Sequence, residues 1–345
     1  MPQLDKLIQP NHKPTYGLFD RPVTHINYQD FDYRTVTNKQ ASKLRKHFAY
    51  KQFQYFGAIA DTLIFGCALA NVRYLGACFV YVFDTATNEM LTWQFKTPFA
   101  MGLSMTDNTD NSASTFKLGN KQVKLSYVLS NDGRREKRLD VSIGSELQIS
   151  AAMQEPADFE TKALCTPCGV NGWVYAQKTA ALKVSGEVKC ALGTIKLDDI
   201  ECYGHHDFSA GFMRRETFWN WACFSTPPSQ ERPALGLNIS WAVNETGYSE
   251  NCLWWGSQCI ELPQVQFEYD RDAILQTWHI RSANDVVKLS FTPHGKHSEQ
   301  LNLGLLATDF HQIFGRFEGT IRLPNDEHVS ISNVWGFVEH QFSRW

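Results

Sequence analysis

The chain contains LKVSGEVKCALGTIKLDDIECYGHHDFS at residues 182–209 and QIFGRFEGTIRLPNDEHVSISNVWGFVEHQFS at residues 312–343. Each stretch opens on a strand-like segment with a central glycine, Gly186 or Gly315, and each ends on His-x-Phe-Ser. The second stretch is five residues longer between glycine and histidine, and the turn-forming residues Pro324-Asn-Asp326 hold the extra length. Similarity on this scale is typical of a duplicated unit, so we predict two tandem β-domains of similar construction.

The rest of the chain has the same character. Short segments of apolar and polar residues, such as 90–96, 123–129, 265–270 and 286–291, recur between turns, and segments with helical spacing are scarce. The 23 Phe, 12 Tyr and 10 Trp residues suit a pleated, half-buried surface. Many short strands at regular spacing favour β-sandwiches or β-barrels.

Net charge and cysteine usage exclude some partners and compartments. The formal net charge is −3, which gives no long-range positive field for nucleic acid. The nine cysteines show no disulfide framework, so we expect reduced thiols in a cytoplasmic protein. The opening residues MPQLDKLIQPNHKP have no basic segment followed by an apolar one, and they predict no signal peptide.

The longest apolar region of the chain is interrupted by Asp61, Asn71 and Arg73. No uninterrupted run within it has the length that spans a bilayer. We therefore expect no integral membrane segment, and we interpret residues 63–70 and 75–83 as two buried strands.

Five segments rich in aromatic and charged residues stand out. They are GWVYAQK (172–178), DFSAGFMRRETFWNW (207–221), GLN (236–238), SENCLW (249–254) and GFVEHQFSRW (336–345). Together they resemble domain-of-unknown-function family 2804, and the match covers most of the chain. More distantly, the arrangement resembles the double-lipocalin proteins, which include carotenoid 1,2-hydratases, tocopherol-cyclase-like proteins and certain pericyclase enzymes. Those proteins carry a Tyr-x-His-x-x-x-x-Gly-like segment at the end of the first barrel, and Tyr203-Gly-His-His-Asp-Phe-Ser-Ala-Gly211 is similar but not identical.

The strand pattern and the resemblance together predict an all-β fold of two tandem lipocalin-like antiparallel β-barrels. We expect a polar, proline-containing N-terminal arm at residues 1–45, a first barrel at 46–213 and a second at 214–345. Each barrel is wide enough for one small ligand. The expected partner is a small apolar or amphipathic molecule, and the protein is expected to be a monomer or a homodimer.

The strand that ends the first barrel carries the densest group of reactive side chains. If Tyr203, His205 and Asp207 share one face of it, His206 lies on the other, so only one histidine enters a given cavity. The repeat pairs His206 with His340, and for His340 we favour a buried imidazole bonded to a backbone carbonyl. For the neighbourhood of His206 and Asp207, a catalytic and a structural role both remain open.

His206, Asp207 and Glu250 are the candidate catalytic residues. A histidine can move a proton near neutral pH, and a carboxyl group in an apolar pocket can act as an acid. The faces of Trp219 and Trp221 can stabilise a carbocation. Such a set suits the cofactor-free hydration, isomerisation or cyclisation of an apolar molecule, which the distant resemblance also implies.

The candidate ligand-binding residues are Tyr203, His205, Lys178, Arg214, Arg215, Trp219, Trp221, Asn251 and Trp254. Several have a structural alternative. Trp219 and Trp221 suit the core of the second barrel. Arg214 or Arg215 can pair with Glu216 or Glu250 across a buried junction, or hold a ligand carboxylate.

We expect neither a metal nor a cofactor. Cys165-Thr-Pro-Cys168 is a lone Cys-x-x-Cys with no second pair at zinc-ribbon spacing, and a structural zinc needs four ligands. His294-Gly-Lys-His297 is interpreted as a polar loop.

Three classes of function remain open from the sequence. A hydratase- or isomerase-like enzyme predicts titratable side chains lining a closed pocket. A lipid or small-ligand carrier predicts an apolar cavity with at most one polar anchor. A carbohydrate-binding module predicts an open groove floored by exposed tryptophans, and the expected lack of a secretion signal disfavours it.

Overall fold

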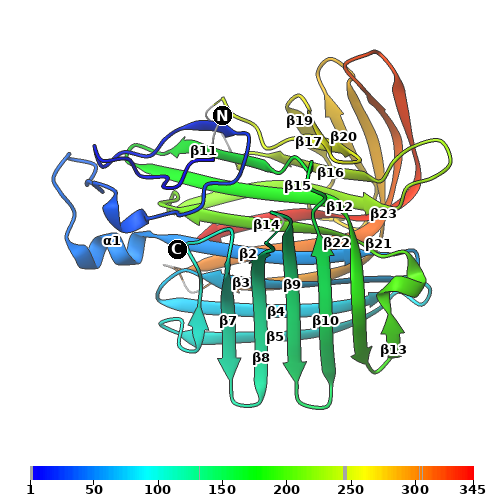
Figure 1. Ribbon diagram of the computed structural model, residues 1–345, viewed down its shortest axis with the longest axis horizontal. Coiled ribbons are helices and arrows are strands. Elements are labelled where there is room, and N and C mark those ends of the chain that lie inside the picture. The colour runs from blue at the N-terminus through cyan, green and yellow to red at the C-terminus, as the bar shows by residue number, and fades with distance from the viewer. Residues whose placement is uncertain (1–2, 132, 244–246, 303, 305) are drawn as a thin grey trace.

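A computed structural model describes residues 3–131, 133–243, 247–302, 304 and 306–345. Within these residues the regular secondary structure is almost all β-strand, with one short α-helix, α1 (Lys43–Ala49), and two 3-10 turns (Tyr28–Asp30 and Leu197–Ile200). The strands form two curled antiparallel sheets (Figure 1). The predicted all-β fold of two tandem lipocalin-like units with an N-terminal arm is confirmed.

The first sheet has 14 strands. In chain order they are β1 (Gly17–Phe19), β2 (Lys51–Ile59), β3 (Leu63–Asn71), β4 (Leu75–Asp84), β5 (Glu89–Pro98), β6 (Leu103–Ser104), β7 (Ser112–Leu118), β8 (Lys121–Leu129), β9 (Arg135–Ile143), β10 (Leu147–Gln154), β11 (Lys162–Cys168), β12 (Gly172–Cys190), β13 (Gly193–Lys196) and β14 (Tyr203–Gly211). The two buried strands predicted in the long apolar region are confirmed as β3 and β4.

The second sheet has nine strands. In chain order they are β15 (Glu216–Thr226), β16 (Leu235–Trp241), β17 (Cys252–Trp255), β18 (Gln258–Glu261), β19 (Val265–Glu268), β20 (Trp278–Ser282), β21 (Val287–Asn302), β22 (Ala307–Arg322) and β23 (His328–Arg344).

The duplication is visible in the strand order. The first sheet runs β5-β4-β3-β2-β14-β12-β10-β9-β8-β7-β6, and the second runs β18-β17-β16-β15-β23-β22-β21-β20-β19. In both sheets the last long strand pairs with the first, β14 with β2 and β23 with β15. Each sheet therefore curls back on itself around its own last strand.

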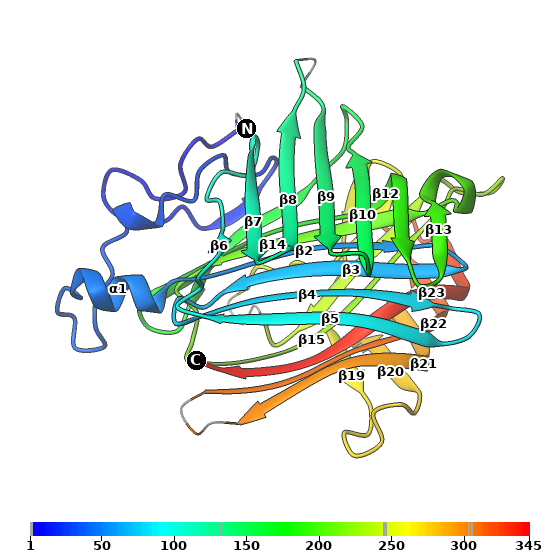
Figure 2. The same ribbon diagram turned by 90° about the horizontal axis from the view of Figure 1, so that it is seen from below.

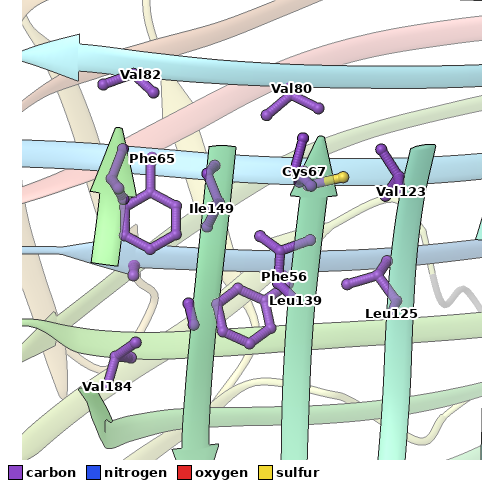
Figure 3. Packing of buried hydrophobic residues seen from close by; sticks show 14 of the residues in the cluster. Phe56, Phe65, Cys67, Val80, Val82, Val123, Leu125, Leu139, Ile149 and Val184 are labelled. Atoms are coloured by element: carbon purple, nitrogen blue, oxygen red, sulfur yellow. The ribbon is translucent and has the colours of Figure 1, made fainter. Parts of the chain in front are cut away.

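The concave side of the first sheet is filled by its own side chains. Strands β7 to β10 cross over β2 to β5 at a steep angle (Figure 1), and apolar residues pack between the two layers (Figure 3). Phe56, Phe65, Val80 and Leu139 are fully buried there. The second sheet encloses a core of the same kind around Phe291 and Phe317.

The repeat is aligned differently from the sequence-based expectation. Gly186 on β12 and Gly319 on β22 both have positive φ, 120° and 135°, and a Cβ at either would clash with the backbone oxygen of the paired strand, at Ser150 or Lys288. The counterpart of Gly186 is thus Gly319 and not Gly315. Gly186 precedes His206 by 20 positions and Gly319 precedes His340 by 21, so the predicted five-residue difference is wrong.

The N-terminal arm covers one end of the first sheet. Its β1 pairs with β11, and Leu7, Val23 and Ile26 are buried against Trp173 of β12. The arm is thus an integral part of the core as well as a cover. No helix in the described ranges has the length and hydrophobicity needed to cross a membrane.

The two paired glycines provide a test of the duplication. Gly186→Ala and Gly319→Ala are each expected to lower the free energy of unfolding by about 2–4 kcal/mol, because both the φ value and the backbone contact exclude a side chain. Gly119→Ala is the control, since Gly119 has φ 58° and no atom lies within 4 Å of the position that a Cβ would take. It is expected to cost about 1 kcal/mol. Chemical denaturation measures all three, and equal losses in the three variants would contradict the close approach at both repeat positions.

Candidate functional site

The convex face of the first sheet packs against the second sheet. In one half of this contact, aromatic side chains fill the space between the sheets. Figure 2 shows β22 and β23 running beside β4 and β5. Tyr55, Tyr81 and Phe83 of the first sheet meet Phe314 and Phe337 of the second, and all five side chains are buried. This aromatic cluster closes one end of the space between the sheets.

The other half of the contact is hollow. A cavity of about 530 Å³ lies there, which we call the inter-sheet cleft. Ala68, Ala70, Ala77 and Ala176 line its wall on the first sheet, where larger side chains would fill it. Phe53, Phe79, Trp219, Trp221 and Phe310 complete the apolar lining. The volume falls within the range of about 300–1,000 Å³ that is common for small-molecule sites.

Charged groups form the floor of the cleft, at the boundary with the aromatic cluster. Lys178 on β12 lies opposite Asp207 on β14, and its Nζ is 2.7 Å from Asp207 Oδ2. The same Nζ is 3.4 Å from Oε1 of Glu250, which precedes β17 of the second sheet, and 4.6 Å from the ring centre of Trp221. Since Lys178, Asp207 and Glu250 are each at most 5% exposed, the ammonium links the two sheets through a buried ion cluster.

Burial and charge act in opposite directions on this cluster. Burial lowers the pKa of Lys178, but the neighbouring charges of Asp207 and Glu250 outweigh it, so the pKa of Lys178 lies above its usual value. Burial raises the pKa of Asp207, and the Lys178 ammonium only partly offsets this. Lys178 therefore keeps its proton and holds both carboxyl groups in place.

Glu339 on β23 completes the floor. Its Oε2 accepts a hydrogen bond from Trp219 Nε1 at 3.2 Å, and its Oε1 accepts one from Gln312 Nε2 at 2.8 Å. Burial raises the pKa of Glu339 to about 8, against the opposing effects of Trp219 and Lys178. The carboxyl group is thus mostly protonated at neutral pH. The buried Oε1 of Gln312 has no partner in the described part of the chain, and turning this amide lets it accept the Glu339 hydroxyl.

Six of the sequence-predicted residues line the cleft. They are Lys178, Asp207, Arg214, Trp219, Trp221 and Glu250. The structure thus brings Asp207 and Glu250 together around Lys178, although they lie 43 positions apart in the chain.

His206 lies on the opposite face of β14, inside the first sheet. Its Nε2 is 3.3 Å from Gln54 Nε2, and its ring packs edge-on against Tyr127. Burial, together with the charge of Lys137, lowers the pKa of His206 well below its usual value, so the imidazole is neutral. His206 does not contact the cleft in which Asp207 lies.

His205 shares the face of Asp207, as the strand alternation predicts, but it lies beyond the floor. Its Nε2 is 3.4 Å from Tyr55 Oη, and its ring packs on Phe337. Burial lowers the pKa of His205 to about 3. The two histidines thus lie on opposite faces of β14, and neither lines the cleft.

The other candidates have structural contacts outside the cleft lining. Trp254 Nε1 donates to the backbone oxygen of Glu160 at 2.7 Å. Asn251 Oδ1 accepts from Ser240 N at 2.8 Å, and its Nδ2 donates to the backbone oxygen of Pro263. Tyr203 begins β14 and Arg215 is exposed on the connection to β15.

His340 corrects one expectation and supports another. Its partners are side chains, Tyr269 Oη at 2.5 Å from Nδ1 and Asp309 Oδ2 at 3.5 Å from Nε2, so the predicted bond to a backbone carbonyl is wrong. Its ring packs edge-on against Tyr269, as that of His206 does against Tyr127. The two histidines therefore occupy similar environments in the two repeats.

Sequence reasoning missed Glu339, although the residue lies inside the C-terminal motif. Strand alternation could have identified Glu339. Since His340 faces the interior of the second sheet, its neighbour in the strand must face the first sheet. Because His340 is equivalent to His206 in the repeat, Glu339 is equivalent to His205. His205 also faces the space between the sheets.

The two motifs considered for metal ligation in the sequence analysis both lie on strands. No group of three or more His, Cys, Asp and Glu side chains is placed to hold a metal ion in the described residues. Cys165 and Cys168 lie on β11, where Cys165 is buried. His294 and His297 lie within β21, not in the predicted loop.

A family model described as "Domain of unknown function (DUF2804)" matches residues 5–345. The chain belongs to this family. The DUF2804 resemblance inferred from the five motifs is thereby confirmed. The sequence matches no curated protein.

Among solved structures, CghA with Sch210972 has the same fold as this DUF2804 protein. The TM-score is 0.56 at 11% identity, and the match covers 98% of this chain and 97% of that one. Kievitone hydratase from Nectria haematococca is also similar, with a TM-score of 0.49 at 10% identity over 85% of this chain and 88% of that one.

Glu339→Gln is expected to become more stabilising relative to the wild type as the pH rises from 6 to 8. The pKa of Glu339 is raised in the folded protein, so its contribution is fully present below the unfolded-state pKa and is lost as pH rises toward 8. Relative to the variant, the wild type should lose about 1 kcal/mol per pH unit in this window. At pH 6 the variant should already be the more stable protein, and its advantage should be larger at pH 9.

Denaturation curves at the two pH values measure this difference. Glu216→Gln is the control, because that side chain is 59% exposed at the edge of the cleft and solvent screens it. An unchanged difference between wild type and Glu339→Gln at pH 6 and 9 would show that Glu339 is ionised throughout.

Lys178→Met is expected to destabilise the protein by about 3–5 kcal/mol, because it leaves buried carboxyl groups without their cation. Adding Asp207→Asn should recover part of the loss, which a double-mutant cycle in denaturant measures. Lys96→Met, which removes the partly exposed partner of Glu299, should cost at most about 1 kcal/mol. Full additivity of the Lys178 and Asp207 changes would argue against the ion cluster.

Proposed function

We propose that this protein binds a small, largely apolar molecule in the inter-sheet cleft and transforms it by proton transfer. The observation that carries the proposal is Glu339, a carboxylic acid that keeps its proton at the floor of an apolar cavity. A neutral acid in such a setting is a proton donor at physiological pH. Asp207 and Glu250 lie within a few ångströms of the Lys178 ammonium at the same level and supply the matching base.

Apart from the ligand, water is the only reactant that the proposed reactions need. Glu339 gives its proton to one carbon of a carbon–carbon double bond, and positive charge develops on the next carbon. Loss of a proton from a neighbouring carbon to Asp207 or Glu250 completes an isomerisation or, after attack by a second double bond, a cyclisation. Addition of water with release of its proton to the same carboxylate completes a hydration. In each case the proton count is restored by return of the proton to Glu339.

Of the two tryptophans, Trp219 is better suited to stabilise the developing charge. The Lys178 ammonium already lies over the ring of Trp221, so that face is occupied by a cation. Trp219 is half-buried, lines the cleft and donates its indole N–H to Glu339. Its ring face can therefore contact a ligand while its indole N–H stays hydrogen-bonded to the Glu339 carboxyl group.

The binding part of the proposal is supported by analogy of fold. CghA shares the architecture over nearly the whole chain and was solved with Sch210972. Since one fold hosts many activities, this likeness supports a ligand site and not a particular reaction.

A non-catalytic carrier is the second candidate. It requires an apolar cavity with at most one polar anchor, whereas four ionisable side chains meet at the floor of this one. A carbohydrate-binding module would need exposed tryptophans, but Trp221 is only 4% exposed. The composition of the floor thus favours the enzyme.

Native mass spectrometry of the protein purified from its own host identifies the bound molecule, and its turnover is then followed by chromatography. Glu339→Gln should lower the rate by about 10²–10⁴-fold. Glu318→Gln, an exposed change on β22 of the same sheet, should leave the rate unchanged. A ligand that binds but is not altered by the wild type would identify a carrier. Full activity in Glu339→Gln would exclude the proposed acid.

A further inference from the structure

A buried lysine lies at the end of the cleft opposite the floor. Lys51 is the first residue of β2, lines the cleft and is only 4% exposed. Its Nζ donates to the backbone oxygens of Phe48 at 2.6 Å and Val72 at 3.0 Å, and it lies 4.9 Å from the ring centre of Tyr74. We call this end of the cleft, around Lys51, Tyr74, Arg214 and Arg344, the mouth.

Lys51 differs in its partners from three other cations that line the cleft. Lys178 has two carboxyl groups, Lys96 has Glu299 at 2.6 Å and Arg344 has Glu216 at 3.5 Å. In the described part of the chain, no carboxylate lies within ion-pair distance of Lys51. Its contacts are two neutral carbonyls and an aromatic ring, which use two of its three N–H groups.

A desolvated ammonium without a counter-ion is costly, and an anion placed beside it is correspondingly favoured. Burial, with the nearby Arg73, lowers the pKa of Lys51 to about 8, so the group is still charged at neutral pH. Arg214 also lines the mouth, whereas the charge of Arg344 there is paired with that of Glu216.

We propose that Lys51 binds the anionic head group, a carboxylate, of an otherwise apolar ligand whose body extends down the inter-sheet cleft. This inference rests on the proposed function, since it assumes that the cleft is the ligand site. It narrows the substrate class from apolar molecules to amphipathic acids.

The register of the strands sets the position of the head relative to the floor. Lys51 pairs with Gly211 on β14, whereas Asp207 pairs with Tyr55, four residues further along β2. At about 3.3 Å per residue this separates head and floor by about 13 Å. Phe53 and Ala176 line the interval. The acid group of the ligand is thus held at the mouth, and proton transfer takes place at its remote apolar end.

Two probes that differ only in charge test the assignment. The fluorescent polyene cis-parinaric acid and its methyl ester are titrated into the full-length protein at pH 7. The acid should bind at least about tenfold more tightly, as expected for a charge-assisted hydrogen bond in a desolvated site. Lys51→Met should remove this preference, and Lys51→Arg should keep most of it. Lys288→Met, an exposed change on β21 outside the cleft lining, is the control and should leave it unchanged.

Each outcome tests a different part of the proposal. Equal binding of acid and ester by the wild type would overturn the head-group inference while leaving an apolar site in place. A preference for the acid that survives in Lys51→Met would overturn the role of Lys51. Failure of both probes to bind would count against the proposed function itself. Because the acid-to-ester ratio is taken within each variant, a general loss of stability does not alter the comparison.

Discussion

The ammonium group of Lys178, buried between two β-sheets, is the interaction on which the rest of the site depends. It is contacted by Asp207 from its own sheet and by Glu250 from the other, so it fixes both the relative placement of the sheets and the level of the cleft floor. A buried cation must be paired, and two carboxyl groups already meet that need. Glu339 is a third carboxyl group close to the Lys178 ammonium. Burial is the main reason that Glu339 keeps its proton, the charge of Asp207 adds to this effect, and the Lys178 ammonium opposes it.

The cleft exists because the two repeats face each other through equivalent strands. β14 and β23 are the last strands of their sheets, and Asp207 and Ser209 on one correspond to Gln341 and Ser343 on the other, all four lining the cavity. Toward one end, large rings such as Tyr81 and Phe314 fill the space between the sheets, with their centres 4.9 Å apart. Toward the other end, alanines leave it open. The backbone arrangement is the same at both ends. Large side chains therefore produce a packed contact at one end, and small side chains leave a cavity at the other.

The general fold and part of the site follow from the sequence. Strand alternation correctly places His205 and Asp207 on one face of β14 and His206 on the other. The strand pattern and the His-x-Phe-Ser repeat correctly indicate two similar units. These features are local, since they depend on a period of two along one strand.

What could not be predicted depends on contacts between distant segments. Whether the inner or the outer face of a curled sheet encloses a cavity is decided by the sizes of side chains on the opposing sheet, which no local pattern records. Thus His206, next to Asp207 in the chain, lies inside a packed core, while Glu339, 132 positions away, lies in the same cleft as Asp207. Gly319 was missed for a similar reason, because its strained φ and its contact with Lys288 belong to the pairing of β21 with β22.

The most direct measurement is a crystal structure of the protein with its native ligand bound. We expect ligand density between the two sheets, with the apolar part of the molecule against Trp219 and within reach of the Glu339 carboxyl group. Density inside the first sheet beside His206, or on the outer surface with the space between the sheets filled by side chains, would contradict this expectation.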